Sequence, residues 1–355
     1  MAIKRNIKVL SLGAAALAAA LVLTGCGNND SAASADEAAV DGTPTIVLYS
    51  NAISDGRGEW IAERAMEDLG INVQLVDDGG VVIANRILAE QNNPMADVVF
   101  GLNQILWSQL IEADAIIPYT PVWADEIPEG LSHPDGWFNA VSLVGNLLAY
   151  DTAQIDNPPT DWLELSSFEG QYAVPNALGG STVQMILSGI FTRFLDEDGH
   201  LGVSDEGWEA VRDLFANGVS TDQDLVAEWV NPANNVGMSQ IWHMGLPPRE
   251  AEFGITAGVV NPEIGIPVSV EGVAIVNGTQ NQEAVERFIN WFGSAEIMNA
   301  FGYAFNYLPA NPNALEGLQD FTIQVSEMKI QDINWDVIAP NMGSWIEHIY
   351  LNYLQ

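Results

Sequence analysis

The sequence between residues 44 and 112 alternates between short apolar runs and amphipathic stretches of helical period. In the first such stretch the apolar residues Ile61, Ala65 and Leu69 recur at helical spacing. The predicted elements are strands over 44–50, 71–76 and 96–100 and helices over 57–69, 81–91 and 103–112. A strand-helix order repeated in this way predicts a parallel sheet covered by helices on both faces.

A second series of elements follows Asp161. The predicted strands are 172–175, 238–242 and 255–260, and the predicted helices are 182–195, 206–216, 282–292 and 345–354. Two extended apolar stretches, 141–150 and 267–276, leave the first series and return to it. Two such crossings predict an α/β fold of two lobes with hinge strands and a central cleft. The predicted division is lobe 1 over 44–140 and 277–355 with the C-terminal helices, hinge crossings over 141–150 and 267–276, and lobe 2 over 151–266.

The N-terminus has the organisation of an export leader. Three basic residues precede an apolar run over 9–23 that is too short to span a bilayer comfortably, and LTGC follows, ending at Cys26. These four residues resemble the lipobox of bacterial lipoproteins, in which the cysteine is lipidated and the leader is cut before it. The predicted parts are a signal peptide over 1–25, a lipidated Cys26 and a flexible tether over 26–43. The alternative is a plain signal peptide with an incidental cysteine.

The charge balance excludes several partners. The chain has 47 acidic and 11 basic residues, and three of the basic residues lie before Cys26. Such a surface repels nucleic acid and anionic headgroups, so we expect no nucleic-acid partner and membrane attachment through the lipid alone. The acidic surface is either a solvated coat suited to high salt or a field that attracts cationic ligands. Cys26 is the only cysteine, which rules out an intrachain disulfide and a thiolate metal cluster.

Four stretches carry a family resemblance. They are 88–101 (LAEQNNPMADVVFG), 162–175 with its W-x-x-L and G-x-x-x-V-P patterns, 262–278 (PEIGIPVSVEGVAIVNG) and 284–297 (AVERFINWFGSAEI). The chain resembles the type II periplasmic-binding-protein fold, and within it the ABC solute-binding proteins labelled ferric-iron or 2-aminoethylphosphonate type. The resemblance is specific for fold and receptor role and weak for the ligand, because this fold hosts many ligands.

The resemblance implies the extracellular receptor subunit of an ABC importer. Such a subunit captures a small polar solute by hinge closure and delivers it to the membrane permease. The implied ligand is ferric iron or a phosphonate or phosphorylated compound. We expect a monomer that is not an enzyme, has no cofactor and is held at the outer face of the membrane by Cys26 or is periplasmic.

Polar residues at strand ends and helix starts are the first candidate ligand contacts, because open α/β lobes bind ligands beyond the carboxyl ends of their strands. Ser50 and Asn51 follow the first strand; the alternative is a helix-capping turn. Gly180, Ser181 and Thr182 precede a helix, where free N–H groups and hydroxyls suit a carboxylate, phosphate or phosphonate. Simple helix capping is the alternative for these three residues.

Four further residues are candidate contacts. Trp242 and His243 close a predicted strand, where an indole and an imidazole can stack on or bind a ligand, although tryptophan is more often a core residue. Arg249 suits an anion or a surface ion pair. Glu271 lies inside the apolar crossing, and a carboxylate there needs a partner, either the ligand or a hinge residue.

Metal binding and catalysis find little support in the sequence. There is no Tyr-Tyr pair, although Tyr303 and Tyr307 are four residues apart as on one helical turn, so the presence of a metal stays open. The chain has no G-x-S-x-G, no H-E-x-x-H and no P-loop. A secreted hydrolase and an adhesive surface lipoprotein are the alternative functions.

Overall fold

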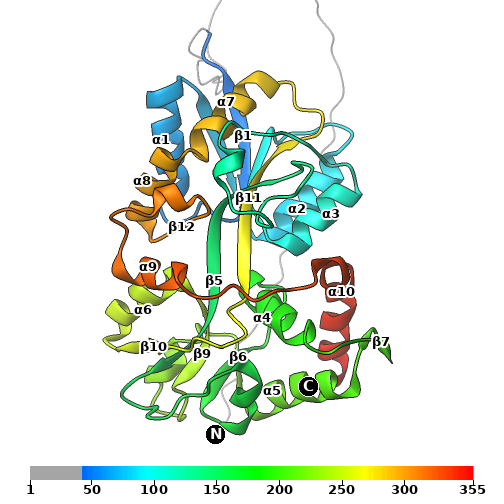
Figure 1. Cartoon of the computed structure of the whole chain (residues 1–355), viewed down its shortest axis with the longest axis vertical. Helices are drawn as coiled ribbons and strands as arrows, with labels where there is room; N and C mark the ends of the chain where they lie inside the picture. Colours follow the sequence, from blue (N-terminus) through cyan, green and yellow to red (C-terminus); the bar gives the residue numbers. More distant parts are fainter. Residues whose placement is uncertain (1–41, 355) are drawn as a thin grey trace, which may run out of the picture. The chain divides into compact units, whose positions relative to one another are not determined.

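The computed structural model describes residues 42–354, which form a mixed β-sheet flanked by helices (Figure 1). The strands are β1 Thr45–Ser50, β2 Asn72–Asp77, β3 Val98–Gly101, β4 Ile116–Ile117, β5 Asn139–Asp151, β6 Tyr172–Pro175, β7 Leu195–His200, β8 Val219–Thr221, β9 Met238–Trp242, β10 Ala257–Val259, β11 Val268–Val276 and β12 Leu308–Pro309. The α-helices are α1 Arg57–Leu69, α2 Gly80–Glu90, α3 Gln104–Glu112, α4 Ser181–Phe191, α5 Asp205–Asn217, α6 Leu246–Phe253, α7 Gln282–Phe292, α8 Ala295–Phe305, α9 Asp320–Ser326 and α10 Trp335–Asn352.

The first three strands form the parallel sheet that the sequence predicts. β1 pairs in parallel with β2 and with β3, and Ser50 lies opposite Asp77 at the end of the first pair. Alternate residues Ile46 and Leu48 of β1 are fully buried, which accounts for the apolar pattern of that run. Because parallel strands end at the same edge, the loops after β1, β2 and β3 lie close together, each leading into a helix.

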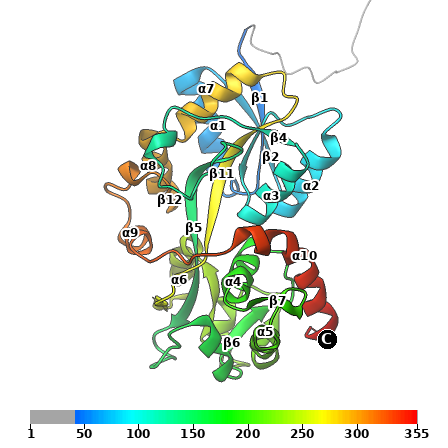
Figure 2. The same ribbon diagram turned by 45° about the vertical axis from the view of Figure 1, so that its right-hand side comes forward.

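The two predicted crossings are the long strands β5 and β11, which run antiparallel to each other (Figure 2). β11 joins β3 to β5, and the later part of β5 pairs with β9 and β10, so the order is β2-β1-β3-β11-β5-β9-β6-β8. The pairing shifts register between Glu271 and Gly272, where a β-bulge interrupts the ladder. The sheet therefore has two halves connected through β5.

A third segment runs beside these crossings and was not predicted. After α9, the backbone of Ile266 donates to Lys329 O at 2.8 Å and accepts from Gln331 N at 2.9 Å. The chain then enters α10, which begins at Trp335 rather than at residue 345 and packs against both α3 and α4. Pro340 lies inside this helix, where it supplies no N–H and makes the helix hard to predict.

Each half of the sheet has an aromatic core. Phe100, Phe288 and Phe292 are fully buried around the first half, and the rings of Phe100 and Phe292 meet edge to face at 4.9 Å. In the second half the ring of Phe191 lies 4.6 Å from that of Trp345 in α10. Burial of each such ring contributes about 2 kcal/mol, so α10 is stabilised by the second core.

The domain division stays a prediction. Gly42–Gln355 group as one compact unit, and no boundary within that unit tests the lobe limits 44–140, 151–266 and 277–355. The predicted leader 1–25, Cys26 and the tether up to residue 41 lie outside the described residues. Within the described range no helix combines the length and hydropathy that a bilayer crossing requires.

Candidate functional site

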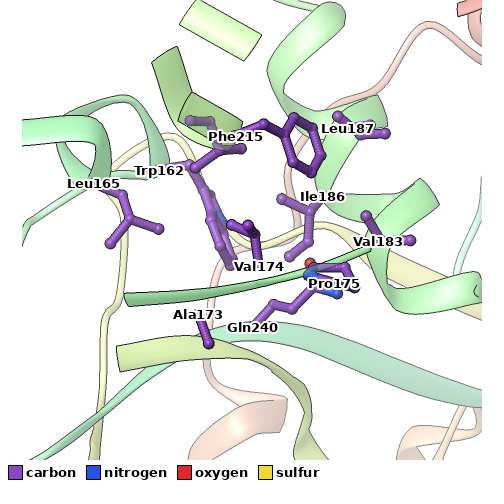
Figure 3. A pocket seen from close by; sticks show the side chains of 11 residues that line it. Trp162, Leu165, Ala173, Val174, Pro175, Val183, Ile186, Leu187, Phe215 and Gln240 are labelled. Atoms are coloured by element: carbon purple, nitrogen blue, oxygen red, sulfur yellow. The ribbon is translucent and has the colours of Figure 1, made fainter. Parts of the chain in front are cut away.

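Two hollows in the second half of the sheet do not suit a solute. The first is a void of about 20 Å³ among apolar side chains, including Trp162, Val183 and Phe215 (Figure 3). It lies between β6, α4 and α5 and is a small packing gap. The second is an open groove of about 720 Å³ that contains Arg193 and Lys329.

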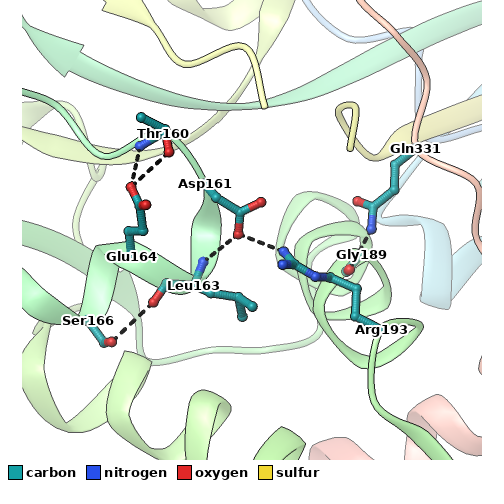
Figure 4. Close-up of polar contacts among 8 residues, drawn as sticks. All are labelled: Thr160, Asp161, Leu163, Glu164, Ser166, Gly189, Arg193 and Gln331. Atoms are coloured by element: carbon teal, nitrogen blue, oxygen red, sulfur yellow. Dashed lines mark hydrogen bonds and ion pairs between the residues drawn. The ribbon is translucent and has the colours of Figure 1, made fainter. Parts of the chain in front are cut away.

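The groove's arginine is already paired. Asp161 Oδ1 accepts from Arg193 Nη1 at 2.6 Å and from the backbone N–H of Leu163 at 2.9 Å (Figure 4). Gln331 Nε2 donates to the carbonyl of Gly189 at 2.6 Å beside it. The first contact joins the start of η2, the 3-10 helix Trp162–Ser167, to the turn after α4, and the second joins the segment before α10 to α4. We therefore assign the groove a structural role.

Two neighbouring cavities lie beyond the carboxyl ends of β1, β2 and β3. We call the one at the starts of α2 and α4 the helix-start cavity, with a volume of about 350 Å³, and its neighbour the central cavity, about 220 Å³. The helix-start cavity is lined by Asn51, Gly79, Gly80, Val81, Val82, Asn103, Leu106, Gly179, Gly180, Ser181 and Gln184. The central cavity is lined by Asn51, Asp55, Arg57, Leu102, Val144, Asn146, Ser181, Thr182, Trp242, Met244, Ser269, Glu271 and Tyr307. Asn51 and Ser181 belong to both walls.

Two helices present uncapped N-termini to the helix-start cavity. Gly79 is the N-cap of α2 and Gly180 the N-cap of α4, and neither glycine has a side chain that could cap its helix. The backbone N–H of Gly79 itself donates to Asp78 Oδ1 at 2.7 Å. Both glycines have ordinary extended backbone angles, with φ of −59° and −73°, and a Cβ at either would meet nothing within 4 Å. Neither position therefore requires glycine for the backbone. The free N–H groups and the helix dipoles make this cavity attractive to an anion.

Asparagine side chains fix the loops around these helix starts. Asn51 Oδ1 accepts from the backbone N–H of Leu102 at 2.7 Å. Asn103 caps α3, and its Nδ2 donates to Ser181 Oγ at 3.2 Å and to Gln184 Oε1 at 3.3 Å. This last pair of bonds joins the first half of the sheet to α4 across the cavity wall.

The central cavity contains one cationic and two acidic side chains. Arg57, the first residue of α1, donates from Nε to the carbonyl of Ala52 at 2.9 Å and lies 3.6 Å from Asp55. Burial raises the pKa of Glu271 to about 7, against opposing effects of the Ser142 hydroxyl and Arg57. Burial likewise raises the pKa of Tyr307 well above its ordinary value, and its hydroxyl donates to Ala52 O at 3.2 Å. Near neutral pH the cavity thus holds a permanent cation beside a carboxyl that titrates.

The predicted contacts that line the cavities come from both halves of the sheet. Asn51, Ser181, Thr182, Trp242 and Glu271 line the central cavity, and Gly180 lines the helix-start cavity. Their role in ligand binding is still a prediction.

The other three predicted residues do not reach either cavity. Ser50 is fully buried, and its Oγ accepts from the N–H of Ala52 at 3.0 Å. His243 is also fully buried, and its Nδ1 accepts from the N–H of Gly145 at 3.1 Å. Arg249 lies behind Trp242 and donates to Asp224 Oδ2 at 2.7 Å.

Several cavity residues were missed in the sequence. Arg57 gave a usable signal, since it is one of very few basic residues and follows the loop after the first predicted strand. Asn103 lies in the loop after the third strand, which the strand-end rule selects. Asn146 and Ser269 gave no such signal, because their approach to the cavity depends on the pairing of β5 with β11. Tyr307 was considered only as one of a tyrosine pair for iron, and its place in the cavity depends on the turn that leads into β12.

The tyrosine pair considered for iron is separated by the structure. α8 ends at Phe305, and Asn306 has a left-handed φ of 58°, so Tyr303 and Tyr307 do not share a helical turn. Tyr303 is 65% exposed whereas Tyr307 is 2% exposed. Among residues 42–354 no group of three His, Cys, Asp or Glu side chains could hold a metal.

Known proteins resemble this chain over most of its length. A family model described as bacterial extracellular solute-binding protein matches residues 93–341. A probable ABC transporter periplasmic-binding protein of Sinorhizobium fredii is 33% identical, over 88% of this chain and 87% of that protein. A putative 2-aminoethylphosphonate-binding periplasmic protein of Salmonella typhimurium is 22% identical, over 84% of this chain and 89% of its own length.

The fold has solved counterparts. The crystal structure of iron-bound HitA from Pseudomonas aeruginosa superposes with a TM-score of 0.73 at 18% identity, covering 86% of this chain and 99% of HitA. At that identity the likeness establishes the type II periplasmic-binding-protein fold and not the ligand. The chain belongs to the bacterial extracellular solute-binding protein family, as a non-enzymatic, periplasmic or extracellular component of an ABC transporter.

Proposed function

We propose that this solute-binding protein captures a small organic anion of the phosphonate or phosphate-ester class. The proposal depends on one arrangement. The starts of α2 and α4, at Gly79 and Gly180, have no side-chain caps and line the same cavity, and the guanidinium of Arg57 lines the adjoining cavity. Two helix dipoles and the first-turn N–H groups of α2 and α4 converge there, and within the described residues no side chain caps those first turns. The N–H of the N-cap Gly79 is already bonded to Asp78 Oδ1. A phosphonate or phosphate oxygen would accept hydrogen bonds from them.

Ferric iron is the second ligand class, since one superposed protein is iron-bound. Iron(III) prefers carboxylate and phenolate oxygens. Within the described residues no group of three His, Cys, Asp or Glu side chains could hold a metal, and burial opposes ionisation of Tyr307, the tyrosine in the central cavity. The chemistry of the cavity therefore favours the organic anion.

Capture by closure follows from the long strands. We propose that the segments 141–150 and 267–276, within β5 and β11, act as the hinge between lobe 1 and lobe 2. Asn103 and Ser181 already meet across the cavity wall at 3.2 Å, and contacts made only on closure supply the differential affinity that selects the closed form. The closed monomer would then engage the membrane permease.

Attachment through Cys26 is part of the proposal. The basic start, the apolar run and the LTGC sequence support cleavage after residue 25 and lipidation of Cys26. Mass spectrometry of the exported protein is expected to find residue 26 at the N-terminus with added acyl mass. A Cys26→Ser variant is expected to be released into the medium or periplasm. If that variant stayed in the membrane fraction, lipidation of Cys26 would not be what holds the protein at the membrane.

The ligand class is tested by calorimetry on the mature chain. The panel is inorganic phosphate, 2-aminoethylphosphonate, a hexose phosphate and ferric citrate. We expect saturable binding of at least one phosphorus compound, and at 100 times Kd a gain in unfolding free energy of about 2.7 kcal/mol. Binding of ferric citrate alone, with none by the phosphorus compounds, overturns the proposal.

A further inference from the structure

A third cavity adjoins the central cavity and shares Trp242 with it. This side chamber has a volume of about 250 Å³ and is lined by Thr182, Gln223, Asp224, Leu225, Val226, Gln240, Ile241, Trp242 and Arg249. Thr182 and Trp242 line both the side chamber and the central cavity. The helix-start cavity, the central cavity and the side chamber thus form a series in which neighbours share walls.

Trp242 lines both of the last two cavities, and its ring is packed against neighbouring groups. Arg249 lies over its ring, with 4.6 Å from the guanidinium carbon to the ring centroid. The same guanidinium donates from Nε to Asp224 Oδ2 at 2.7 Å and from Nη1 to Gly245 O at 3.1 Å. A Cβ on Gly245 would come within 2.5 Å of the indole, so the ring packs directly on that backbone. Trp242 is 36% exposed, so part of the packed indole offers an aromatic surface to a ligand.

The chamber's lining is polar but balanced in charge. Its two charged side chains, Arg249 and Asp224, neutralise each other, and hydrogen bonds and the charge of Arg249 lower the pKa of Asp224 although burial acts to raise it. The other polar groups are the amides of Gln223 and Gln240 and the hydroxyl of Thr182. Amide and hydroxyl groups bind neutral hydroxyl groups well and offer no advantage to a second anion.

The geometry points to a two-part ligand, an organic phosphate or phosphonate whose uncharged, hydroxyl-bearing body passes Trp242 into the side chamber. This inference rests on the proposed function, which assigns the anionic end to the helix starts. Two consecutive residues at the start of α4 line the first and last of the three cavities: Ser181 lines the helix-start cavity and Thr182 lines the side chamber. Arg249 and Asp224 then act as positioning residues, because they hold Trp242 rather than touch the charged group.

The test compares a short and a long anion. Calorimetry measures the affinity of the mature chain for inorganic phosphate and for a hexose phosphate. In the chamber-filling variant Gln223→Trp an exposed loop residue is replaced, and Gln282→Trp is the matched control at the exposed start of α7. We expect the hexose phosphate to bind at least about tenfold more tightly than phosphate, and Gln223→Trp to remove that preference while phosphate affinity stays within about twofold.

Each outcome decides the inference. Equal affinity for the two anions in the unaltered chain overturns it, as does equal weakening of both by Gln223→Trp. Loss of the preference in Gln282→Trp as well also overturns it. If neither anion binds, the proposed function itself fails and takes this inference with it.

Discussion

The hydroxyl of Ser142 donates to Glu271 Oε2 at 3.0 Å and so joins the two long strands β5 and β11. The bond lies next to the β-bulge and borders the central cavity. A carboxyl whose pKa is about 7 thus lies between the two strands proposed as the hinge. The ionisation state of Glu271 therefore affects both the stability of the folded protein and the charge of the cavity that a ligand enters.

Glu271→Gln is expected to change how stability depends on pH. The ordinary pKa of 4.5 is raised to about 7 in the folded chain, so the folded state keeps a proton that the unfolded chain releases. The unfolding free energy of the unaltered protein therefore falls as pH rises from 4.5 to 7. The variant lacks this loss, so its unfolding free energy is expected to exceed that of the unaltered protein by about 3 kcal/mol at pH 8 and by less than about 1 kcal/mol at pH 5. Urea unfolding at both values checks this, and a constant difference contradicts it.

Arg57→Gln is expected to weaken binding of the phosphorus compounds about 10- to 100-fold, since a charge-assisted hydrogen bond is removed from the central cavity. Arg64→Gln is the matched control, because Arg64 lies on the same helix and pairs with Asp68 at 3.1 Å outside the cavity. Calorimetry on the two variants checks the assignment. If Arg57→Gln and Arg64→Gln weakened binding equally, the loss of one positive charge anywhere on the helix, and not a contact of Arg57 with the ligand, would account for the effect.

His243→Ala is expected to lower the unfolding free energy by about 1–3 kcal/mol, because it leaves the buried N–H of Gly145 without its acceptor. His243→Asn offers an oxygen near the place of Nδ1 and is expected to restore part of the loss. Denaturant unfolding at pH 7 measures both variants, and an equal loss in the two refutes the role of the hydrogen bond.

His243 also predicts acid sensitivity. Burial lowers its pKa from 6.5 to about 4, against a smaller opposing effect of the Asn306 carbonyl. The unfolded chain takes up a proton first, so this residue's contribution to stability is complete above pH 6.5 and is lost as pH falls towards 4. The difference in unfolding free energy between the unaltered chain and His243→Asn should therefore narrow between pH 7 and pH 4.5. A difference independent of pH would show that His243 does not titrate in this range.

Local patterns predicted most of the elements, and pairing between distant segments decided the site. The strands and helices between residues 44 and 112 follow from apolar periodicity, and the helix start at Ser181 follows from the glycines before it. Burial of Ser50 and His243 could not be read from local pattern, because it depends on strands and loops packed from elsewhere. Tyr307 reaches the cavity because Asn306 ends α8 with a left-handed turn, which no apolar period reveals.

The uncapped helix starts give the most direct test of the central claim. Calorimetry with the tightest-binding phosphorus compound compares the double variant Gly79→Asp, Gly180→Asp with the control Gly79→Ala, Gly180→Ala. Aspartate at an N-cap occupies the free N–H groups, so we expect stability to rise by about 0.5 kcal/mol per helix and affinity to fall at least about 100-fold. The alanine pair has open space for both methyl groups and is expected to bind within about threefold of the unaltered chain. Full binding by the aspartate variant would contradict an anion held at these two helix starts.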